Sequence, residues 1–207
     1  MTILPHTPHK PGRSGGLSCL SAGPSPRQFI TGGTDCQLRL WTIKSRDLSA
    51  TKSKSLLVGL PAKPSALLCE GSQVYAACGK QLLMMDIERP RAAPTKVSIT
   101  TVHHIHHSPD PHQIILEVCL LGYLFRYRTI FDIFQVGDLY DQAHVFDHRT
   151  LIKPVLRLGY VSPEGRKQTK YFRGAPFDNH FFVRGFQDGT ICIWDLRNLR
   201  NVGTSTI

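Results

Sequence analysis

The stretch "FVRGFQDGTICIWDL" (182–196) carries apolar residues at every second position on both sides of a short polar turn. The stretch "FITGGTDCQLRLW" (29–41) overlays it from its first residue without a gap. An aspartate stands in the turn of each copy, at Asp35 and Asp188, where its side chain can accept hydrogen bonds from backbone amides. The matched apolar pairs are Ile30 with Val183, Leu38 with Ile191, and Leu40 with Ile193. The pattern predicts one strand–turn–strand hairpin that occurs twice.

Upstream residues extend the match and predict a further strand before each hairpin. "LSCLSAGPSPRQFI" (17–30) overlays "VHHIHHSPDPHQII" (102–115) with two prolines and a glutamine in common. Weaker copies are "VYAACGKQLLMMD" (74–86), aligned with residues 30–42, and "AHVFD" (143–147). The residues that close the four copies are Trp41, Met85, Phe146 and Trp194. They are separated by 44, 61 and 48 positions, and a four-stranded propeller blade takes roughly 40–45 residues.

These copies resemble the repeats of the WD-repeat family, which close on Trp-Asp as Trp194 and Asp195 do. The resemblance implies an all-β fold, a β-propeller of four-stranded antiparallel blades around a central channel. It also implies structural roles for five repeat positions, which are Asp35, Trp41, Asp188, Trp194 and Asp195. The family's Gly-His dipeptide is not recognisable in any copy, and Thr42 rather than aspartate follows Trp41.

The spacing predicts about four blade-like units after a flexible N-terminal lead-in over residues 1–14. The units are expected at about 15–44, 60–88, 97–149 and 153–200. Propellers close with roughly four to eight blades, the WD-repeat family commonly uses seven, and no obvious closing strand follows Trp194, so we expect an incomplete propeller. Such a chain would leave an apolar sheet face or an unpaired edge open to association. The polar stretches 46–55 and 89–96 are predicted to connect units, and 160–170 is predicted as a basic loop.

The third unit holds about 20 surplus residues, at about 118–141. This segment is unusually apolar for a turn between strands, although arginines and an aspartate argue against a membrane span. Two hypotheses account for it. One is an inserted element that docks a partner, and the other is a translated intron kept in a gene model. The second is preferred at this point, because the segment interrupts a hairpin in place of extending its tip.

Composition favours a folded, intracellular protein, in the nucleus or the cytoplasm. Of the 207 residues, 41% are hydrophobic, and the proline-interrupted N-terminus lacks a signal-peptide core. The six cysteines lie far apart without a C-x-x-C pair, so we expect reduced, buried thiols. The formal net charge is +10, but the basic residues are scattered and form no nucleic-acid-binding motif.

A histidine tract at 103–107, "HHIHH", is the main candidate for chemistry. If it lies in a strand, only alternate residues share a face, so His104 and His106 could form a pair while His103 and His107 point the other way. A structural zinc site usually has four ligands, and no partner residue stands at a fixed spacing. We therefore expect a polar strand edge and no metal, cofactor or catalytic site. The chain also lacks a phosphate-binding loop and a nucleophile elbow.

The resemblance implies a non-catalytic scaffold that binds other proteins. The net charge gives the alternative, a basic WD-repeat protein associated with nucleic acid or ribonucleoprotein. A metal-dependent or hydrolytic enzyme is the least favoured reading. No membrane partner is expected, and fold alone does not identify the protein partner.

Overall fold

The structure is a computed structural model, and it divides into two compact units, Met1–Ile105 and His106–Ile207. We describe each unit by itself. The described residues are 15–44, 51–89, 92–99, 101–108, 110–119, 142–150, 154–160, 173–197 and 202–205. The predicted lead-in (1–14) and most of the surplus segment (120–141) lie outside this set, as does nearly all of the predicted loop at 160–170.

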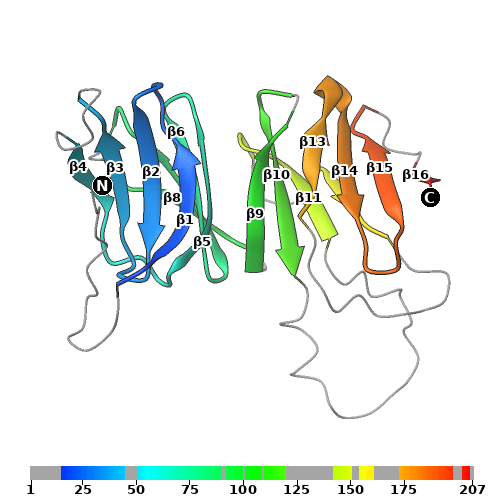
Figure 1. Ribbon diagram of the computed structural model, residues 1–207, viewed down its shortest axis with the longest axis horizontal. Helices are drawn as coiled ribbons and strands as arrows, with labels where there is room; N and C mark the ends of the chain where they lie inside the picture. The colour runs from blue at the N-terminus through cyan, green and yellow to red at the C-terminus, as the bar shows by residue number, and fades with distance from the viewer. Residues whose placement is uncertain are drawn as a thin grey trace, which may run out of the picture. The chain divides into compact units, whose positions relative to one another are not determined.

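The described residues form four antiparallel sheets, each with four strands in chain order, which we call blades 1 to 4 (Figure 1). Blade 1 contains β1 (Leu17–Ala22), β2 (Gln28–Gly33), β3 (Leu38–Thr42) and β4 (Lys52–Leu57). Blade 2 contains β5 (Pro64–Glu70), β6 (Gln73–Cys78), β7 (Gln81–Asp86) and β8 (Thr95–Ser98). The all-β prediction is confirmed, and the four sheets are consistent with WD-repeat blades.

Blade 3 contains β9 (Thr101–His107), β10 (Gln113–Cys119), β11 (Gln142–Asp147) and β12 (Leu156–Leu158), and the boundary between the two units falls within β9. Blade 4 contains β13 (Ala175–Phe177), β14 (Phe181–Gly185), β15 (Ile191–Asp195) and β16 (Val202–Ser205). The one helical element within the described ranges is a single 3₁₀ turn, η2 (Asp178–His180), between β13 and β14. The sequence "GTICIWDL" thus supplies the third strand of blade 4.

The second and third strands of blades 1 and 4 pair as predicted. Phe29 lies opposite Trp41, and Phe182 lies opposite Trp194. In blade 2 the predicted alignment is wrong by one residue, because Val74 pairs with Met85 and so corresponds to Phe29 and not to Ile30. The cause is a tighter turn in which only Gly79 and Lys80 join the strands, with Gly79 at a φ of +61°.

The predicted connection at 46–55 is also partly wrong. Lys52, Ser53, Lys54 and Ser55 belong to β4, the fourth strand of blade 1, and all four are exposed. Likewise, the first two residues of β8 fall in the predicted connection at 89–96. These are edge strands with one neighbour each, so their side chains carry little of the apolar alternation that identifies a strand.

Each blade has two faces, because successive side chains along a strand point to opposite sides of the sheet. Residues that lie opposite each other in neighbouring strands point to the same side and so share a face. We call face A the side that carries the closing residue of the third strand, for example Trp41 or Trp194. Face B is the other side, and it carries the flanking residues, for example Leu40 or Ile193. This distinction describes how neighbouring blades stack within each unit.

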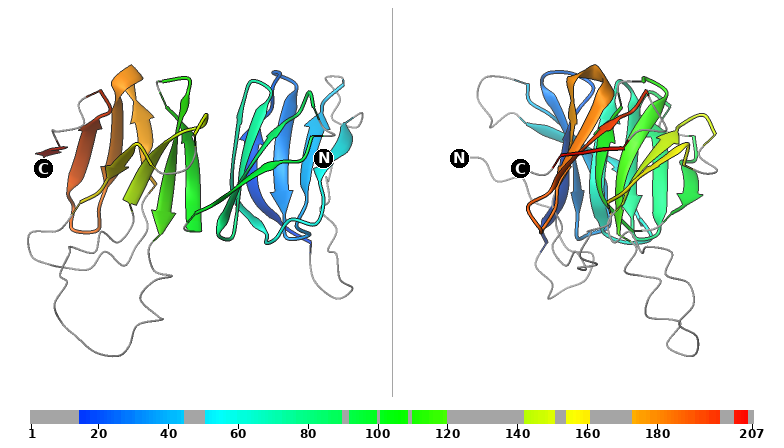
Figure 2. Two further views of the ribbon diagram at one scale, coloured as in Figure 1. Left: turned by 180° about the vertical axis from the view of Figure 1, so that it is seen from behind. Right: turned by 90° about the vertical axis from the view of Figure 1, so that its right-hand side faces the viewer.

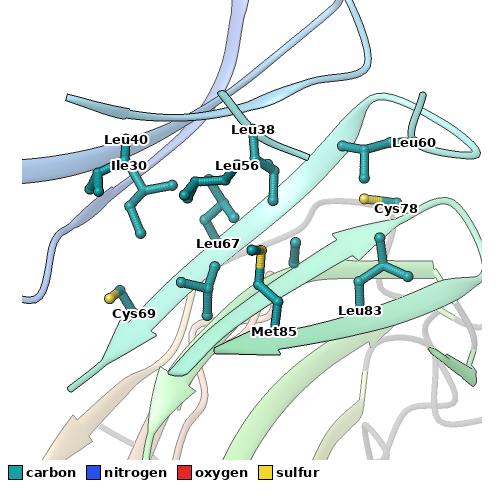
Figure 3. Close-up of a cluster of buried hydrophobic side chains, with 12 residues drawn as sticks. Ile30, Leu38, Leu40, Leu56, Leu60, Leu67, Cys69, Cys78, Leu83 and Met85 are labelled. Atoms are coloured by element: carbon teal, nitrogen blue, oxygen red, sulfur yellow. The ribbon is translucent and has the colours of Figure 1, made fainter. Parts of the chain in front are cut away.

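In unit 1 the sheets of blades 1 and 2 lie next to each other (Figures 1 and 2), and face A of blade 2 covers face B of blade 1. The buried side chains between the two sheets are apolar or thiol groups, drawn in Figure 3. Blade 1 contributes Ile30, Leu38, Leu40 and Leu56, and blade 2 contributes Leu67, Cys69, Val74, Ala76, Cys78, Leu83 and Met85. Because side chains alternate between the two sides of a strand, the apolar residues on one face of each sheet together form a shared core.

Unit 2 repeats this arrangement with blades 3 and 4. Face A of blade 4 presents Phe182, Cys192 and Trp194, which pack on face B of blade 3. The buried residues that blade 3 supplies are Ile115, Ala143, Val145 and Leu158. In both units, then, face A of the later blade covers face B of the earlier one.

The second and third strands of blade 3 pair in continuous register from Gln113 opposite Asp147 to Val118 opposite Gln142. The surplus segment therefore joins the ends of two paired strands, as a hairpin connection does. The premise that it interrupts the hairpin is wrong, because both strands complete their ladder before and after it. The docking and intron hypotheses both concern residues 120–141, which lie outside the described residues.

Candidate functional site

The two turn aspartates make the same local hydrogen bond. Asp35 is completely buried and its Oδ1 accepts from the Gln37 amide at 3.2 Å. In blade 4, Asp188 Oδ1 accepts from the Thr190 amide at 3.0 Å, and the Tyr160 hydroxyl donates to Asp188 Oδ2 at 2.9 Å. These bonds hold the turn between the second and third strands, so both carboxylates stabilise turns.

The closing tryptophans of blades 1 and 4 are both buried, but their indole nitrogens differ. Trp41 Nε1 donates to Thr31 Oγ1 at 2.7 Å, and the Trp41 ring is stacked on Phe29 with 6.0 Å between centroids. Trp194 Nε1 is buried and has no hydrogen-bond partner among the described residues. The reason is visible in the overlay, because Arg184 stands where Thr31 stands in blade 1.

The aspartate that closes the third strand forms a turn in three blades. Asp86, Asp147 and Asp195 each accept a hydrogen bond from the backbone amide two residues later, at 2.9, 2.9 and 3.0 Å. Of the five predicted repeat positions, Asp195 therefore has equivalents in blades 2 and 3. In blade 1, Thr42 takes this position, and its hydroxyl accepts from Gln28 Nε2 at 3.2 Å.

In blades 3 and 4 the same aspartates bind an arginine side chain, a feature that was not predicted from the sequence. Asp147 and Asp195 each bind the guanidinium of the arginine two residues later through both carboxylate oxygens. The side chains of Arg149 and Arg197 are 59% and 58% exposed. The Arg197 hydrogen bonds lower the pKa of Asp195 to about 2. A repeated D-x-R pattern, "DHR" and "DLR", was the available signal.

A cluster of buried polar groups lies between blades 3 and 4. Glu117, on face B of blade 3, is completely buried, and its Oε1 lies 2.5 Å from His106 Nε2 and accepts from the Gly174 amide at 2.9 Å. Arg184 Nε of blade 4 lies 4.0 Å from Glu117 Oε2. We call these four residues the Glu117 cluster.

Close packing surrounds the Glu117 cluster. A side chain at Gly174 would place its Cβ 2.4 Å from Cζ of Phe182, so only glycine lets the backbone amide approach the carboxylate here. The rings of His106 and Phe182 meet edge to face with 5.5 Å between centroids. The polar contacts thus lie within an apolar, close-packed joint between the two blades.

The predicted polar edge at 103–107 needs correction. His107 is exposed, but His106 is buried and bound to Glu117, so the tract contributes one residue to the interior. His103 and His104 are half-buried. Within the ranges that the structure describes, no group of three or more histidine, cysteine, aspartate or glutamate residues could hold a metal ion.

Five cysteine thiols can be described, and three of them are buried. Cys69, Cys78 and Cys192 are buried, and Cys19 and Cys36 are half-buried. Burial raises the pKa of Cys78 to about 12 and the pKa values of Cys19 and Cys192 to about 11. Because the thiolate is the nucleophile, these three side chains are poor candidates for covalent chemistry at neutral pH.

His144 in β11 makes the stability of unit 2 depend on pH. Burial, and secondly the charge of Arg157, lowers the pKa of His144 to about 4. The unfolded chain, with a histidine pKa near 6.5, binds more protons between these values, so stability falls as the pH drops from about 6.5 to about 4. We expect a loss of up to about 3 kcal/mol in the free energy of unfolding over this range.

Urea unfolding at pH 7 and pH 4.5 measures this loss. His144→Leu removes the titrating group and is expected to flatten the difference between the two pH values. His107→Leu, at an exposed position, serves as the control and leaves the difference unchanged. An unaltered pH dependence in His144→Leu would show that other groups cause it.

Comparison with known proteins finds one family match. The family model "WD domain, G-beta repeat" (WD40) matches residues 5–42, which include the first three strands of blade 1. A search of curated proteins finds no match. None of the helices in the described part of the chain is long and apolar enough to cross a membrane. One matched repeat, within four sheets of the same strand order, confirms the resemblance to WD repeats and makes the chain consistent with the WD-repeat family.

Proposed function

We propose that this chain is a non-catalytic scaffold that binds other proteins, located inside the cell. The observation that carries the proposal is the WD-repeat match in a chain built of repeated blades, because WD40 repeats typically mediate protein–protein interactions. The raised thiol pKa values support a non-catalytic role. The nucleophilic form of cysteine is the thiolate, and little of it forms at Cys19, Cys78 and Cys192 at neutral pH.

Two arginines of unit 2 are the best candidates for contact with a partner. Arg149 and Arg197 occupy equivalent turns of blades 3 and 4, and each guanidinium is exposed but fixed by its aspartate. A fixed side chain loses less conformational entropy on binding than a free one. Arginine is also among the residue types that contribute most to protein interfaces. The equivalent turns therefore favour a protein partner with acidic or carbonyl acceptors.

Affinity capture of the tagged full chain from native cells tests the proposal. The double variant Arg149→Ala/Arg197→Ala is expected to reduce the captured partner by at least about tenfold, because two such truncations cost about 1 kcal/mol or more each. Lys52→Ala/Lys96→Ala is the matched control, since it removes two exposed positive charges from β4 and β8. Equal losses in both variants would point to net charge instead of the two turns.

The same experiment decides against the alternative partner class. Capture at low and high salt, with and without nuclease, separates a protein partner from nucleic acid. Binding to nucleic acid falls steeply with salt, because neutralised phosphates release their counterions. A captured fraction that vanishes with nuclease would replace the proposed function with binding to nucleic acid or ribonucleoprotein.

A further inference from the structure

Face B of blade 4 is more exposed than face B of blades 1 and 3 at the same repeat positions. In blade 1, Ile30, Leu38 and Leu40 are 0%, 0% and 8% exposed under blade 2. In blade 3 the equivalent Ile115, Ala143 and Val145 are buried under blade 4. In blade 4 the equivalent residues are Val183, Ile191 and Ile193, of which the first two are half-buried and Ile193 is 39% exposed. Face B of blade 4 thus has the apolar composition of a face that is buried between two blades, but it is not buried.

Neighbouring residues extend the exposed apolar surface of blade 4. Phe177 in β13 lies opposite Phe181 in β14, and Ala175 lies opposite Val183, so all four lie on face B. Phe177 is 60% exposed and Ala175 is exposed too, while Phe181 and Val183 are half-buried. An apolar sheet face of this kind marks an interaction site.

Face A of blade 1 is exposed along β1, whereas Thr31 and Trp41 on the same face are buried. Leu17 and Leu20 are both 58% exposed. They share this face because an irregularity in register between Leu17 and Cys19 places Leu17 opposite Gly33 and Leu20 opposite Thr31. In blade 2 the equivalent positions are Pro64 and Leu67, which have the same kind of register shift and are buried against blade 1.

The two exposed surfaces belong to a face B and a face A, which are the two faces that pack together between neighbouring blades. Within unit 1 and again within unit 2, a face B is covered by a face A, and the same repeat positions meet. We propose that face B of blade 4 in one copy packs on face A of blade 1 in a second copy of this chain. The occupant follows from the repeat, since blade 1 presents the surface that blades 2 and 4 use to cover a face B.

Such a contact is head-to-tail, because it joins two different surfaces. Copies related in this way form a closed ring if the rotation closes and a longer chain if it does not. The proposal concerns the blade faces and is independent of any partner held by the turns of Arg149 and Arg197.

Analytical ultracentrifugation of the full chain with charged substitutions on each face tests the contact. Wild-type protein is expected to self-associate. Leu20→Glu and Ile193→Glu are each expected to weaken this association by at least about a hundredfold, because a carboxylate would be buried without a partner. Mixing the two variants is expected to restore a one-to-one complex. The Leu20→Glu copy keeps its blade 4 face, and the Ile193→Glu copy keeps its blade 1 face.

Circular dichroism confirms that each variant is folded before the measurement. Leu17→Glu and Phe177→Glu replace any variant that is not, since both side chains are more than half exposed. A wild-type chain that stays monomeric at all concentrations would overturn the proposal. So would a Leu20→Glu chain that self-associates like wild type, since two blade 4 faces would then pair with each other. A mixture of the variants that stays monomeric would overturn it as well.

Discussion

Glu117→Ala is expected to lower the free energy of unfolding of unit 2 by about 3–5 kcal/mol, the usual cost of removing one partner from a buried ion pair. The carboxyl group is completely buried, is hydrogen-bonded to His106 Nε2 and accepts a hydrogen bond from the Gly174 amide. Its removal leaves the Arg184 side chain, only 3% exposed, without the negative charge 4.0 Å away. Because the four residues come from both blades, the loss weakens the joint between blades 3 and 4.

Urea unfolding followed by tryptophan fluorescence measures this effect. The chain has two tryptophans, Trp41 in unit 1 and Trp194 in unit 2, so a Trp41→Phe background makes Trp194 the reporter of unit 2. Glu117→Gln keeps one oxygen for His106 and the Gly174 amide and replaces the other, near Arg184, with an uncharged NH2 group, so its cost should be smaller than that of Glu117→Ala. Glu88→Ala removes an exposed carboxylate and is expected to change stability by less than about 0.5 kcal/mol.

The comparison between the variants is decisive. A Glu117→Ala protein as stable as Glu88→Ala would show that the Glu117 cluster contributes nothing to the joint. Equal losses in Glu117→Ala and Glu117→Gln would show that the oxygen bonded to His106 and the Gly174 amide contributes nothing by itself.

Trp194→Ala is expected to cost about 3–5 kcal/mol, the range found for deleting a large aromatic side chain from a core. Trp194 is 2% exposed and lies among Phe182 and Phe186, with ring centroids 6.1 and 6.3 Å away. The loss combines the apolar surface that is no longer buried with the cavity that remains. Urea unfolding followed by far-ultraviolet circular dichroism checks the value without relying on the deleted fluorophore.

Trp194→Phe separates packing from hydrogen bonding. The indole nitrogen of Trp194 has no partner among the described residues, so a phenyl ring should cost only the smaller ring volume, below about 1.5 kcal/mol. Trp41→Phe additionally removes the hydrogen bond to Thr31, so it should cost about 1 kcal/mol more than Trp194→Phe. A Trp194→Phe protein as unstable as Trp194→Ala would contradict this account.

The repeat could be predicted from the sequence because its signal is local. In each hairpin the apolar residues alternate over a few positions and an aspartate stands in the turn. The match between Asp35 and Asp188 therefore shows that the two hairpins are copies of one repeat. The error in blade 2 has the same origin, because a gapless overlay assumes that every turn has one length. The turn at Gly79 and Lys80 is shorter, and it contains no apolar residue from which the difference in turn length could be predicted.

The Glu117 cluster was harder to predict, because its members are far apart in the chain. Gly174 lies 57 residues after Glu117, and only the packing of one sheet on another brings them together. The sequence did hold a signal. In blade 3, Glu117 shares the face of the buried Ile115, and in blade 4, Arg184 shares the face of the buried Phe182. Opposite charges at inward positions of neighbouring repeats indicate a buried pair.

The continuous ladder between β10 and β11 has a consequence for how this gene can vary. Val118 and Gln142 lie opposite each other, so the chain leaves the blade and returns to it at points about 5 Å apart. A segment with such ends can be gained, lost or exchanged between generations, or between alternative messengers, while the strands on either side keep their partners. Natural selection can therefore act on residues 120–141 separately from blade 3, whichever origin that segment has.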